Sequence, residues 1–82
     1  MKIQYSYKAQ GDFGTLSKDI QKRIAKKMRF YELQKDPLKF AQRLTDPREG
    51  QFRFRIGDWR LIFDVKDDAI FILRIKHRSR AY

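Results

Sequence analysis

The chain has 82 residues, of which 41% are hydrophobic, and 20 Lys and Arg outnumber 10 Asp and Glu to give a formal net charge of +10. This length suits one domain, expected over residues 1–82, and the apolar content argues against a disordered chain. Since the chain has no cysteine and a single histidine, His77, disulfides and clustered metal ligands are excluded, and no metal or other cofactor is expected.

The excess of positive charge predicts a polyanionic partner, either a nucleic acid or an acidic protein. A basic surface that meets only water is the plain alternative. The segment MKIQYSYKAQ at the start lacks the apolar stretch of a secretory signal. No apolar run approaches the roughly 18 residues that span a membrane. We therefore expect a cytoplasmic protein that does not associate with membranes.

The N-terminal half predicts a strand followed by a helix. Apolar and polar residues alternate over residues 2–8, which is typical of a strand. Gly11 and Gly14 allow a short, frayed helix after it. From Ser17, a suitable N-cap, to about Gln34 the residues favour a helix. Its apolar stripe consists of Ile20, Ile24, Met28 and Tyr31.

The segment after this helix reads as a connection. Pro37 ends the helix, because proline cannot donate the backbone hydrogen bond that a helix needs. Residues 38–50 include Pro47 and Gly50 and predict a short turn or loop.

A β-hairpin follows in the segment QFRFRIGDWRLIFDV. Its first strand alternates aromatic or aliphatic residues with arginine, and Gly57-Asp58 then interrupts the pattern. Glycine in the first central position suits a two-residue type II′ turn. Such a turn determines the pairing of the strands. The expected pairs are Ile56 with Trp59, Arg55 with Arg60, and Phe54 with Leu61.

The last strand completes a three-stranded antiparallel meander. An odd-numbered loop around Asp67-Asp68 is expected, because a two-residue turn would direct Arg74 into the core. We expect an α+β fold with two layers, in which the long helix packs on one face of the meander. The residues expected on that face are Phe52, Phe54, Leu61, Phe63, Phe71, Leu73 and Ile75. The residues of the last strand expected on the opposite face are Ile70, Ile72, Arg74 and Lys76.

Cations gather on the face opposite the helix. The register places Arg53, Arg55 and Arg60 there, with Lys76 beside Arg60. Arg78 would share this face if the strand ran that far. Because like charges directly opposite on a sheet are destabilising, an anion is expected to bind there. The alternative is that the arginines simply extend into water.

The segment KHRSRAY at the end of the last strand suggests chemistry. Cleavage of a phosphodiester without a metal needs a base, an acid and cations that stabilise the phosphate. His77 could transfer protons, and Tyr82 could share that role or stack on a base, although both residue types are more often surface or packing residues in such places. The cations proposed for the phosphate are Arg55, Arg60 and Arg78. The residues proposed to bind the rest of an RNA are Arg53, Arg74, Lys76 and Arg80.

These segments resemble the RelE/ParE superfamily of toxins. The run FRFRIGDWRLIFDVKDDAIFILRIKHRSRAY is similar to the C-terminal half of that family, and SKDIQKRIAKKM with the following Lys-Asp-Pro-Leu is similar to its helical part. The most specific parts are IGDWRLIFDV and HRSRAY. The resemblance implies a RelE-like fold, cleavage of mRNA, usually on the ribosome, and neutralisation by a co-expressed antitoxin that wraps the toxin.

The resemblance also implies roles for individual residues. The basic catalytic residues of the family's first meander strand fall on Arg53 and Arg55, and its later arginines fall on Arg60 and Arg78. The terminal tyrosine falls on Tyr82. Some relatives have lysine at the first two positions, and arginine, which stays protonated, cannot readily act as a base. This difference favours His77 as the base.

The superfamily leaves alternatives open. Its ParE branch contains gyrase poisons, which need a binding surface and no acid–base residues, and a non-catalytic relic that binds RNA or antitoxin is a third hypothesis. The ending HRSRAY is closer to the RelE branch. The favoured hypothesis is an endoribonuclease with mRNA, the ribosome and an acidic antitoxin as partners, the last in a hetero-oligomer.

Overall fold

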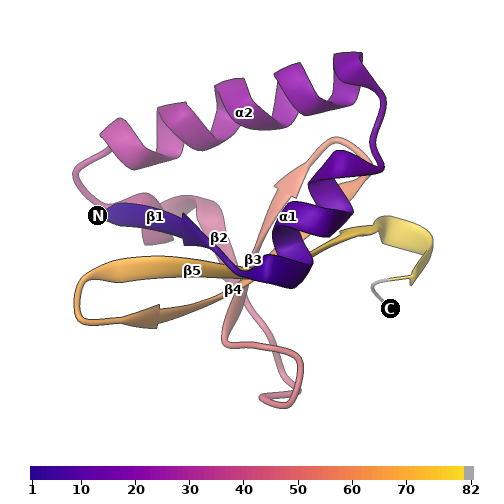
Figure 1. Cartoon of the computed structure of the whole chain (residues 1–82). Helices are drawn as coiled ribbons and strands as arrows, with labels where there is room; N and C mark the ends of the chain where they lie inside the picture. The colour runs from indigo at the N-terminus through magenta and orange to yellow at the C-terminus, as the bar shows by residue number, and fades with distance from the viewer. Residues whose placement is uncertain (81–82) are drawn as a thin grey trace.

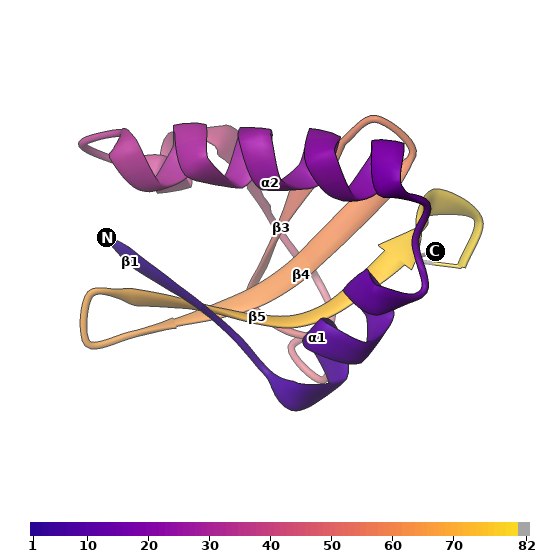
Figure 2. The same ribbon diagram turned by 45° about the horizontal axis from the view of Figure 1, so that its top comes forward.

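The computed structural model describes residues 1–80 and consists of a five-stranded sheet with a long helix across one face (Figures 1 and 2). The sheet has the strand order β1-β5-β4-β3-β2. No helix within residues 1–80 is long and apolar enough to cross a membrane. The elements in chain order are β1 (Lys2–Tyr5), α1 (Tyr7–Gly14), α2 (Lys18–Leu33), the 3₁₀ helix η1 (Pro37–Phe40), β2 (Ala41–Arg43), β3 (Phe52–Ile56), β4 (Trp59–Lys66), β5 (Ala69–His77) and the 3₁₀ helix η2 (Arg78–Arg80).

The N-terminal strand is shorter than predicted, because a serine starts a helix inside the expected strand. The Ser6 side chain accepts a hydrogen bond from the Ala9 N–H at 3.0 Å and donates one to the Leu73 carbonyl at 2.9 Å. The prediction is therefore wrong beyond Tyr5, and the short helix expected around Gly11 and Gly14 begins earlier, at Tyr7. A capping serine satisfies an N–H group that the first turn of a helix leaves unpaired, and so favours the start of a helix at this point.

The edge of β5 is covered by two different elements. β1 pairs with the first half of β5 in parallel, with Lys2 opposite Ala69 and Tyr5 opposite Ile72. α1 then lies along the second half of β5, as both views of the ribbon show (Figures 1 and 2). The edge of β5 therefore has a strand beside its first half and a helix beside its second half.

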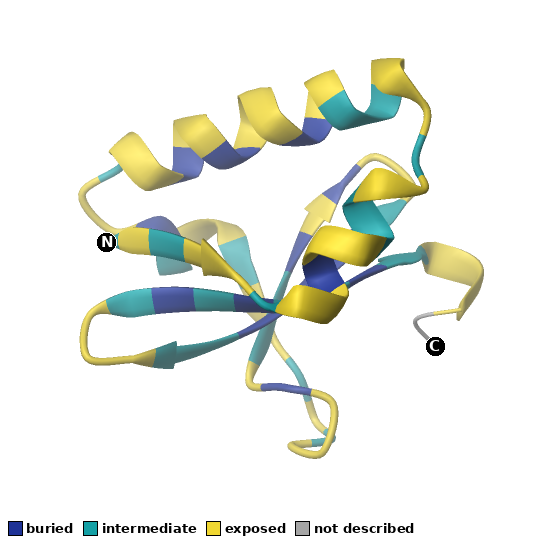
Figure 3. Cartoon of the chain, in the orientation of Figure 1, coloured by how far each residue is buried: buried dark blue, intermediate teal, exposed yellow. Residues whose placement is uncertain are grey.

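The long helix α2 agrees with the prediction. Ser17 caps it by accepting a hydrogen bond from the Ile20 N–H at 3.3 Å. Three residues of the predicted stripe, Ile24, Met28 and Tyr31, are buried, and Ile20 is partly buried against the core. The colouring by burial shows this buried side of α2 facing the sheet (Figure 3). The stripe therefore joins the two layers.

The β3–β4 hairpin also has the predicted register. Ile56 pairs with Trp59, Arg55 with Arg60, and Phe54 with Leu61. Gly57 has a φ of 59°, whereas Asp58 has no positive φ, which fits a type II′ turn. The two-residue turn thus places the basic side chains on one face and the apolar ones on the other.

The β4–β5 connection differs from the prediction. Asp67 and Asp68 form a two-residue turn with φ angles of 52° and 62°, so the expected odd-numbered loop is wrong. The parity changes further along, at a bulge where Ile62 pairs with Arg74 and Phe63 pairs with Ile72. The extra residue that a bulge inserts keeps Arg74 out of the core without lengthening the turn.

This bulge also corrects the predicted core. Ile70 and Ile72, expected on the opposite face, are fully buried in the hydrophobic core. Leu73, expected in the core, has no partner in the register and is only partly buried. Phe71 likewise belongs to neither the buried core nor the hydrophobic residues packed against it. The two-residue turn therefore exchanges the faces of residues 70–73 relative to the prediction.

A second difference lies in the segment expected to be a loop. Residues 37–40 form η1, and β2 pairs with β3, with Ala41 opposite Phe54 and Arg43 opposite Phe52. The strand has three residues and no apolar alternation that would predict it. Because β2 begins at Ala41, opposite Phe54, no strand within residues 1–80 lies beside the outer edge of β3 beyond Phe54.

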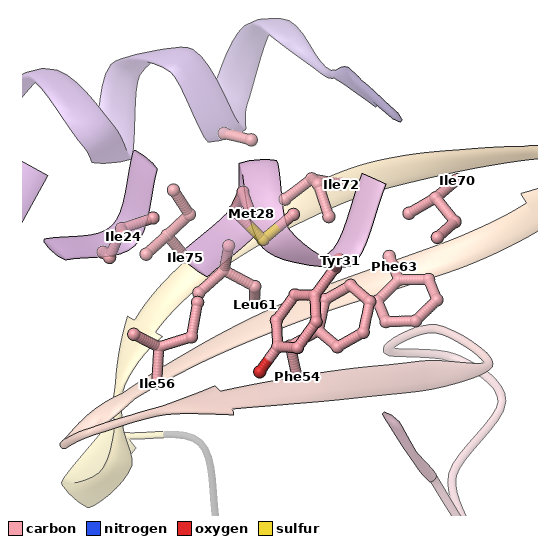
Figure 4. Packing of buried hydrophobic residues seen from close by; sticks show 11 residues of the cluster. Ile24, Met28, Tyr31, Phe54, Ile56, Leu61, Phe63, Ile70, Ile72 and Ile75 are labelled. Atoms are coloured by element: carbon pink, nitrogen blue, oxygen red, sulfur yellow. The ribbon is translucent and has the colours of Figure 1, made fainter. Parts of the chain in front are cut away.

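The core lies between α2 and the sheet. The rings of Tyr31 and Phe54 stack with centroids 4.2 Å apart, and Phe54 stacks on Phe63 at 4.5 Å (Figure 4). Phe54 and Phe63 are fully buried, and such aromatic pairs stabilise a fold by about 0.5–1.5 kcal/mol beyond the area that they bury. Aliphatic residues fill the rest of the layer, namely Ile24, Met28, Ile56, Leu61, Ile70, Ile72 and Ile75.

Candidate functional site

Basic side chains line the face of the sheet opposite α2. The alternation of the strands and the bulge in β5 bring them to this one face, which we call the arginine face. Register pairs Arg60 of β4 with Arg55 on one side and with Lys76 on the other, as expected. The arginine face consists of Arg53, Arg55, Arg60, Arg74 and Lys76.

Arg60 is the centre of this face. The residue is only 3% exposed, and its Nη1 donates hydrogen bonds to the carbonyls of Gly57 at 2.9 Å and Trp59 at 3.0 Å. Its Nε has no hydrogen-bond partner, and no carboxylate within residues 1–80 forms an ion pair with it. A buried guanidinium that lacks an acidic partner is costly, so the fold maintains a positive charge here that a bound anion would stabilise.

The other arginines of this face differ in how far their charge is offset. Arg53 donates a hydrogen bond from Nε to the Gln42 side chain at 3.0 Å. Arg74 forms a two-pronged ion pair with Asp12 of α1, at 2.9 and 3.1 Å. Arg55 is exposed at the end of β3. Arg55 therefore offers an exposed cation, Arg60 keeps a buried charge without an ion-pair partner within residues 1–80, and the charge of Arg74 is offset by Asp12.

Asp12 is a functional neighbour that the sequence did not reveal. The hydrogen bond from Arg74 holds the pKa of Asp12 below its usual value, and the Ile75 N–H, which donates at 2.9 Å, and the charge of Lys76 act in the same direction. The same carboxylate raises the pKa of Arg74. Because Asp12 and Arg74 are 62 positions apart, no local pattern could have predicted the pair.

Arg78 meets the same turn as Arg60. β5 ends at His77, so the predicted parity does not extend to Arg78, which begins η2. Its N–H donates to the Asp58 carbonyl at 2.7 Å, and its Nε lies 3.6 Å from the Asp58 carboxylate. The Gly57-Asp58 turn therefore holds Arg60 through one residue and Arg78 through the next.

His77 lies at this end of the sheet but on the other face. It alternates with Lys76 along β5 and pairs with Trp59, whose ring meets it edge-on at 5.2 Å. The Ser79 N–H donates to His77 Nδ1 at 3.3 Å, and the Ser79 hydroxyl lies 3.0 Å from the same nitrogen. Since Nδ1 accepts the N–H, the neutral ring carries its proton on Nε2, and the free edge of the ring presents a donor.

A groove opens at the edge of β5 beside His77. It has a volume of about 740 Å³ and runs between the end of α1 and η2. Arg74 and Lys76 of the arginine face line it together with His77 and Arg80, so the groove connects the two faces at this edge. Tyr82, the other residue proposed for proton transfer, lies outside the described residues.

The predicted site is thus brought together only in part. Arg55, Arg60, His77 and Arg78 all lie around the Gly57-Asp58 turn, at one end of the sheet. They do not share one face, because His77 points away from the arginine face. An arrangement of this kind can bind a phosphate at the arginines and hold a proton donor at the edge of the strand.

A family model described as "ParE toxin of type II toxin-antitoxin system, parDE" matches residues 3–82 of the chain. No sequence among curated proteins matches it significantly.

Solved structures show the same fold. The toxin–antitoxin complex RelBE2 from Mycobacterium tuberculosis contains a chain that is 26% identical, with a TM-score of 0.77 and coverage of 94% of this chain and 96% of that chain. The archaeal RelE–RelB complex from Pyrococcus horikoshii is also 26% identical, with a TM-score of 0.74 and coverage of 96% of both chains. YafQ from E. coli is 17% identical, covers 99% of this chain and 97% of its own, and has a TM-score of 0.70, a likeness of fold alone.

Proposed function

Since the chain belongs to the ParE toxin family of type II toxin–antitoxin systems and is a RelE-like member of the RelE/ParE superfamily, we propose that this toxin is a metal-independent endoribonuclease that cleaves mRNA. The observation that carries the proposal is Arg60, 3% exposed and without an ion-pair partner within residues 1–80, between two further cations in the register. A phosphate is the anion that planar guanidinium groups bind best.

In the proposed reaction the substrate supplies its own nucleophile. The ribose 2′-oxygen attacks the adjacent phosphorus and loses its proton, and the bond from phosphorus to the 5′-oxygen breaks. The products are a 2′,3′-cyclic phosphate and a 5′-hydroxyl. Arg60 and Arg78, both held at the Gly57-Asp58 turn, would stabilise the charge on the pentacovalent phosphate.

Proton transfer is assigned to the C-terminal residues. When its ring is charged, His77 can donate the Nε2 proton to the leaving 5′-oxygen, while the Ser79 hydroxyl accepts a hydrogen bond from Nδ1–H. In the present hydrogen-bond arrangement the ring offers no free acceptor for the 2′-OH proton. We therefore propose His77 as the acid and retain Tyr82 as a candidate for the other proton transfer or for stacking.

The test is cleavage of RNA by the purified toxin, with and without ribosomes. We expect cleavage to persist in EDTA, to give a 2′,3′-cyclic or 3′-phosphate, and to stop when the cleaved nucleotide is 2′-deoxy. Arg60→Ala and Arg78→Ala should lower kcat more than they raise KM, whereas Arg29→Ala on the exposed side of α2 should change neither. Products with 5′-phosphates would contradict the mechanism.

A gyrase poison of the ParE type is the second candidate, and the description of the matching family model favours it. It would act through a binding surface alone. An assay of DNA supercoiling by gyrase distinguishes the two, because a gyrase poison would inhibit supercoiling and leave RNA intact. An endoribonuclease would have the opposite effects, and would meet its mRNA substrate in the cytoplasm.

For the antitoxin partner we propose an acidic, amphipathic binding segment that forms a hetero-oligomer with the toxin. The net charge of +10 supports this, since complementary charges speed association. The rate of association should fall steeply as salt is added. Association that is insensitive to salt would argue against an acidic segment.

A further inference from the structure

We propose that a second groove, next to the arginine face, binds a base of the single-stranded RNA by stacking it on Tyr7. We call it the Tyr7 groove. It has a volume of about 520 Å³, lies between the start of α1 and the loop that contains Arg48, and has Ile62 and Leu73 on its floor. The inference rests on the proposed RNA substrate and adds a subsite for a nucleotide other than the one that is cleaved.

Tyr7 is the most exposed large hydrophobic residue in residues 1–80, at 90%. It is the first residue of α1, and its backbone is held in place by Ser6, whose N–H donates to the Ile72 carbonyl at 2.9 Å and whose side chain bonds Leu73. The ring is thus presented to solvent from a well-anchored backbone. An aromatic ring in this setting contributes little to the fold, and its open face is free to stack on a ligand.

The groove combines an apolar floor with basic walls. Ile62 is 2% exposed and Leu73 is partly buried, so the floor is apolar and Leu73 provides most of its accessible surface. Lys8 and Lys76 line the walls and form no ion pair within residues 1–80. Aromatic rings for the bases and cations for the phosphates are the two features that proteins use to bind single-stranded RNA.

Acidic neighbours only partly offset the basic walls. Arg48 is paired with Asp46 at 3.1 Å, and Arg74, also in the groove, is paired with Asp12. Glu49 is the one acid among the lining residues, against four basic ones. The balance of charge therefore remains positive and suits a phosphate backbone.

The Tyr7 groove is continuous with the arginine face. Lys76 lines the groove and pairs with Arg60 in the register. Ile62 is two residues beyond Arg60 on β4, which corresponds to about 7 Å along a strand. An RNA with one phosphate at Arg60 would consequently reach Tyr7 with a neighbouring nucleotide.

RNA suits this groove better than a peptide strand does. The floor belongs to β4, an inner strand, and to the part of β5 beyond Ile72, where α1 replaces β1 at the edge. A peptide added as an extra strand needs free backbone groups at an edge, and here the Leu73 carbonyl already accepts from Ser6 and the Ile75 N–H already donates to Asp12. A stacked base needs only the ring, the floor and the cations.

The test is binding of a fluorescein-labelled, single-stranded 2′-O-methyl RNA, which the proposed reaction cannot cleave, followed by fluorescence anisotropy. Tyr7→Ala should weaken binding about 5- to 100-fold, since stacking on one base contributes that much to affinity. Tyr7→Phe should bind like the parent, because it keeps the ring. Leu33→Ala is the matched control, since it removes another exposed apolar side chain, 77% exposed, from α2.

Binding of an abasic oligonucleotide and binding of the antitoxin are measured as two further controls. Tyr7→Ala should bind the abasic backbone and the antitoxin as the parent does. Equal binding of the base-containing RNA by Tyr7→Ala and the parent would overturn the inference, and so would a loss confined to antitoxin binding. Cleavage by the parent with no effect of Tyr7→Ala on binding refutes the subsite alone. Binding that depends on Tyr7 without any cleavage supports the subsite and refutes the proposed endoribonuclease.

Discussion

Alternate residues of the same strands form the face of the sheet under α2 and the face opposite it, but the two faces bury different kinds of side chain. Under α2, Phe54, Leu61 and Phe63 are fully buried and stack or pack against the helix. On the arginine face, a charged side chain, Arg60, is also buried, next to the aliphatic Ile62. The first arrangement stabilises the fold by removing apolar surface from water. The second buries a charge without an acidic partner within residues 1–80, which contributes little or nothing to folding and which we propose is stabilised by a bound anion.

The largest expected effect comes from breaking the apolar face. Phe54→Ala removes a ring that stacks on both Tyr31 and Phe63, and should lower the free energy of unfolding by about 3–5 kcal/mol in urea or guanidinium denaturation. Leu33→Ala, at an exposed position, should change it by less than about 0.5 kcal/mol. Equal effects of the two substitutions would show that the core does not centre on the aromatic stack.

Substitution of Arg60 should separate function from stability. Arg60→Met keeps the apolar stem but removes the charge, and should lower the cleavage rate about 10²–10³-fold, as loss of a group that stabilises a transition state does. Its free energy of unfolding should change by less than about 1 kcal/mol or rise, because the buried charge has no acidic partner within residues 1–80. A strongly destabilised variant with a normal rate per folded molecule would reverse this assignment.

The Asp12–Arg74 pair is the place where a cation of the arginine face stabilises the fold. Asp12→Asn should lower the free energy of unfolding by about 1–2 kcal/mol at neutral pH, since it weakens hydrogen bonds to a charged group. The pKa of Asp12 is lowered in the folded state, so this stabilisation is present above its ordinary value of 3.8 and is lost as the pH falls through the lower, folded value. Urea unfolding from neutral pH to below pH 3.8 should show the difference between variant and parent shrinking. A constant difference would mean that the carboxylate charge is not involved.

The smallest effect is expected at the turn that assigns the residues of β5 to the two faces. Asp67 and Asp68 both have positive φ, and type I′ turns favour Asn-Gly at these positions. Asp68→Gly should therefore raise the free energy of unfolding by about 0.5–1 kcal/mol, because glycine adopts this backbone without strain. Asp68→Asn should give a smaller increase. A loss of stability would indicate that the Asp68 side chain supports the turn.

Features that depend on neighbours in the chain could be predicted from the sequence. The α2 helix follows from its cap and from the spacing of its stripe, and the β3–β4 register follows from a two-residue turn. That register was enough to place Arg55 opposite Arg60. Lys76 does lie beside Arg60 as expected, but the bulge in β5 places it there and the expected odd-numbered loop does not exist. In each case a local feature, a cap or a turn, determines where the element begins, and the regular period of the helix or strand then determines which way its side chains point.

Other features were decided by contacts between distant parts of the chain. The parallel pairing of β1 with β5, the short strand β2 and the bulge opposite Phe63 have no signature in a local pattern. The same is true of the burial of Arg60, whose charge has no ion-pair partner within residues 1–80, and of the Asp12–Arg74 pair, in which the charge is neutralised. The sequence shows which side chains can carry a charge, but the solvation and the ion-pair partner of each depend on the residues that surround it in the folded chain. For this protein the sequence alone determined that positive charge would gather on one face of the sheet, and the tertiary structure decided which of those charges are buried and which are paired with a carboxylate.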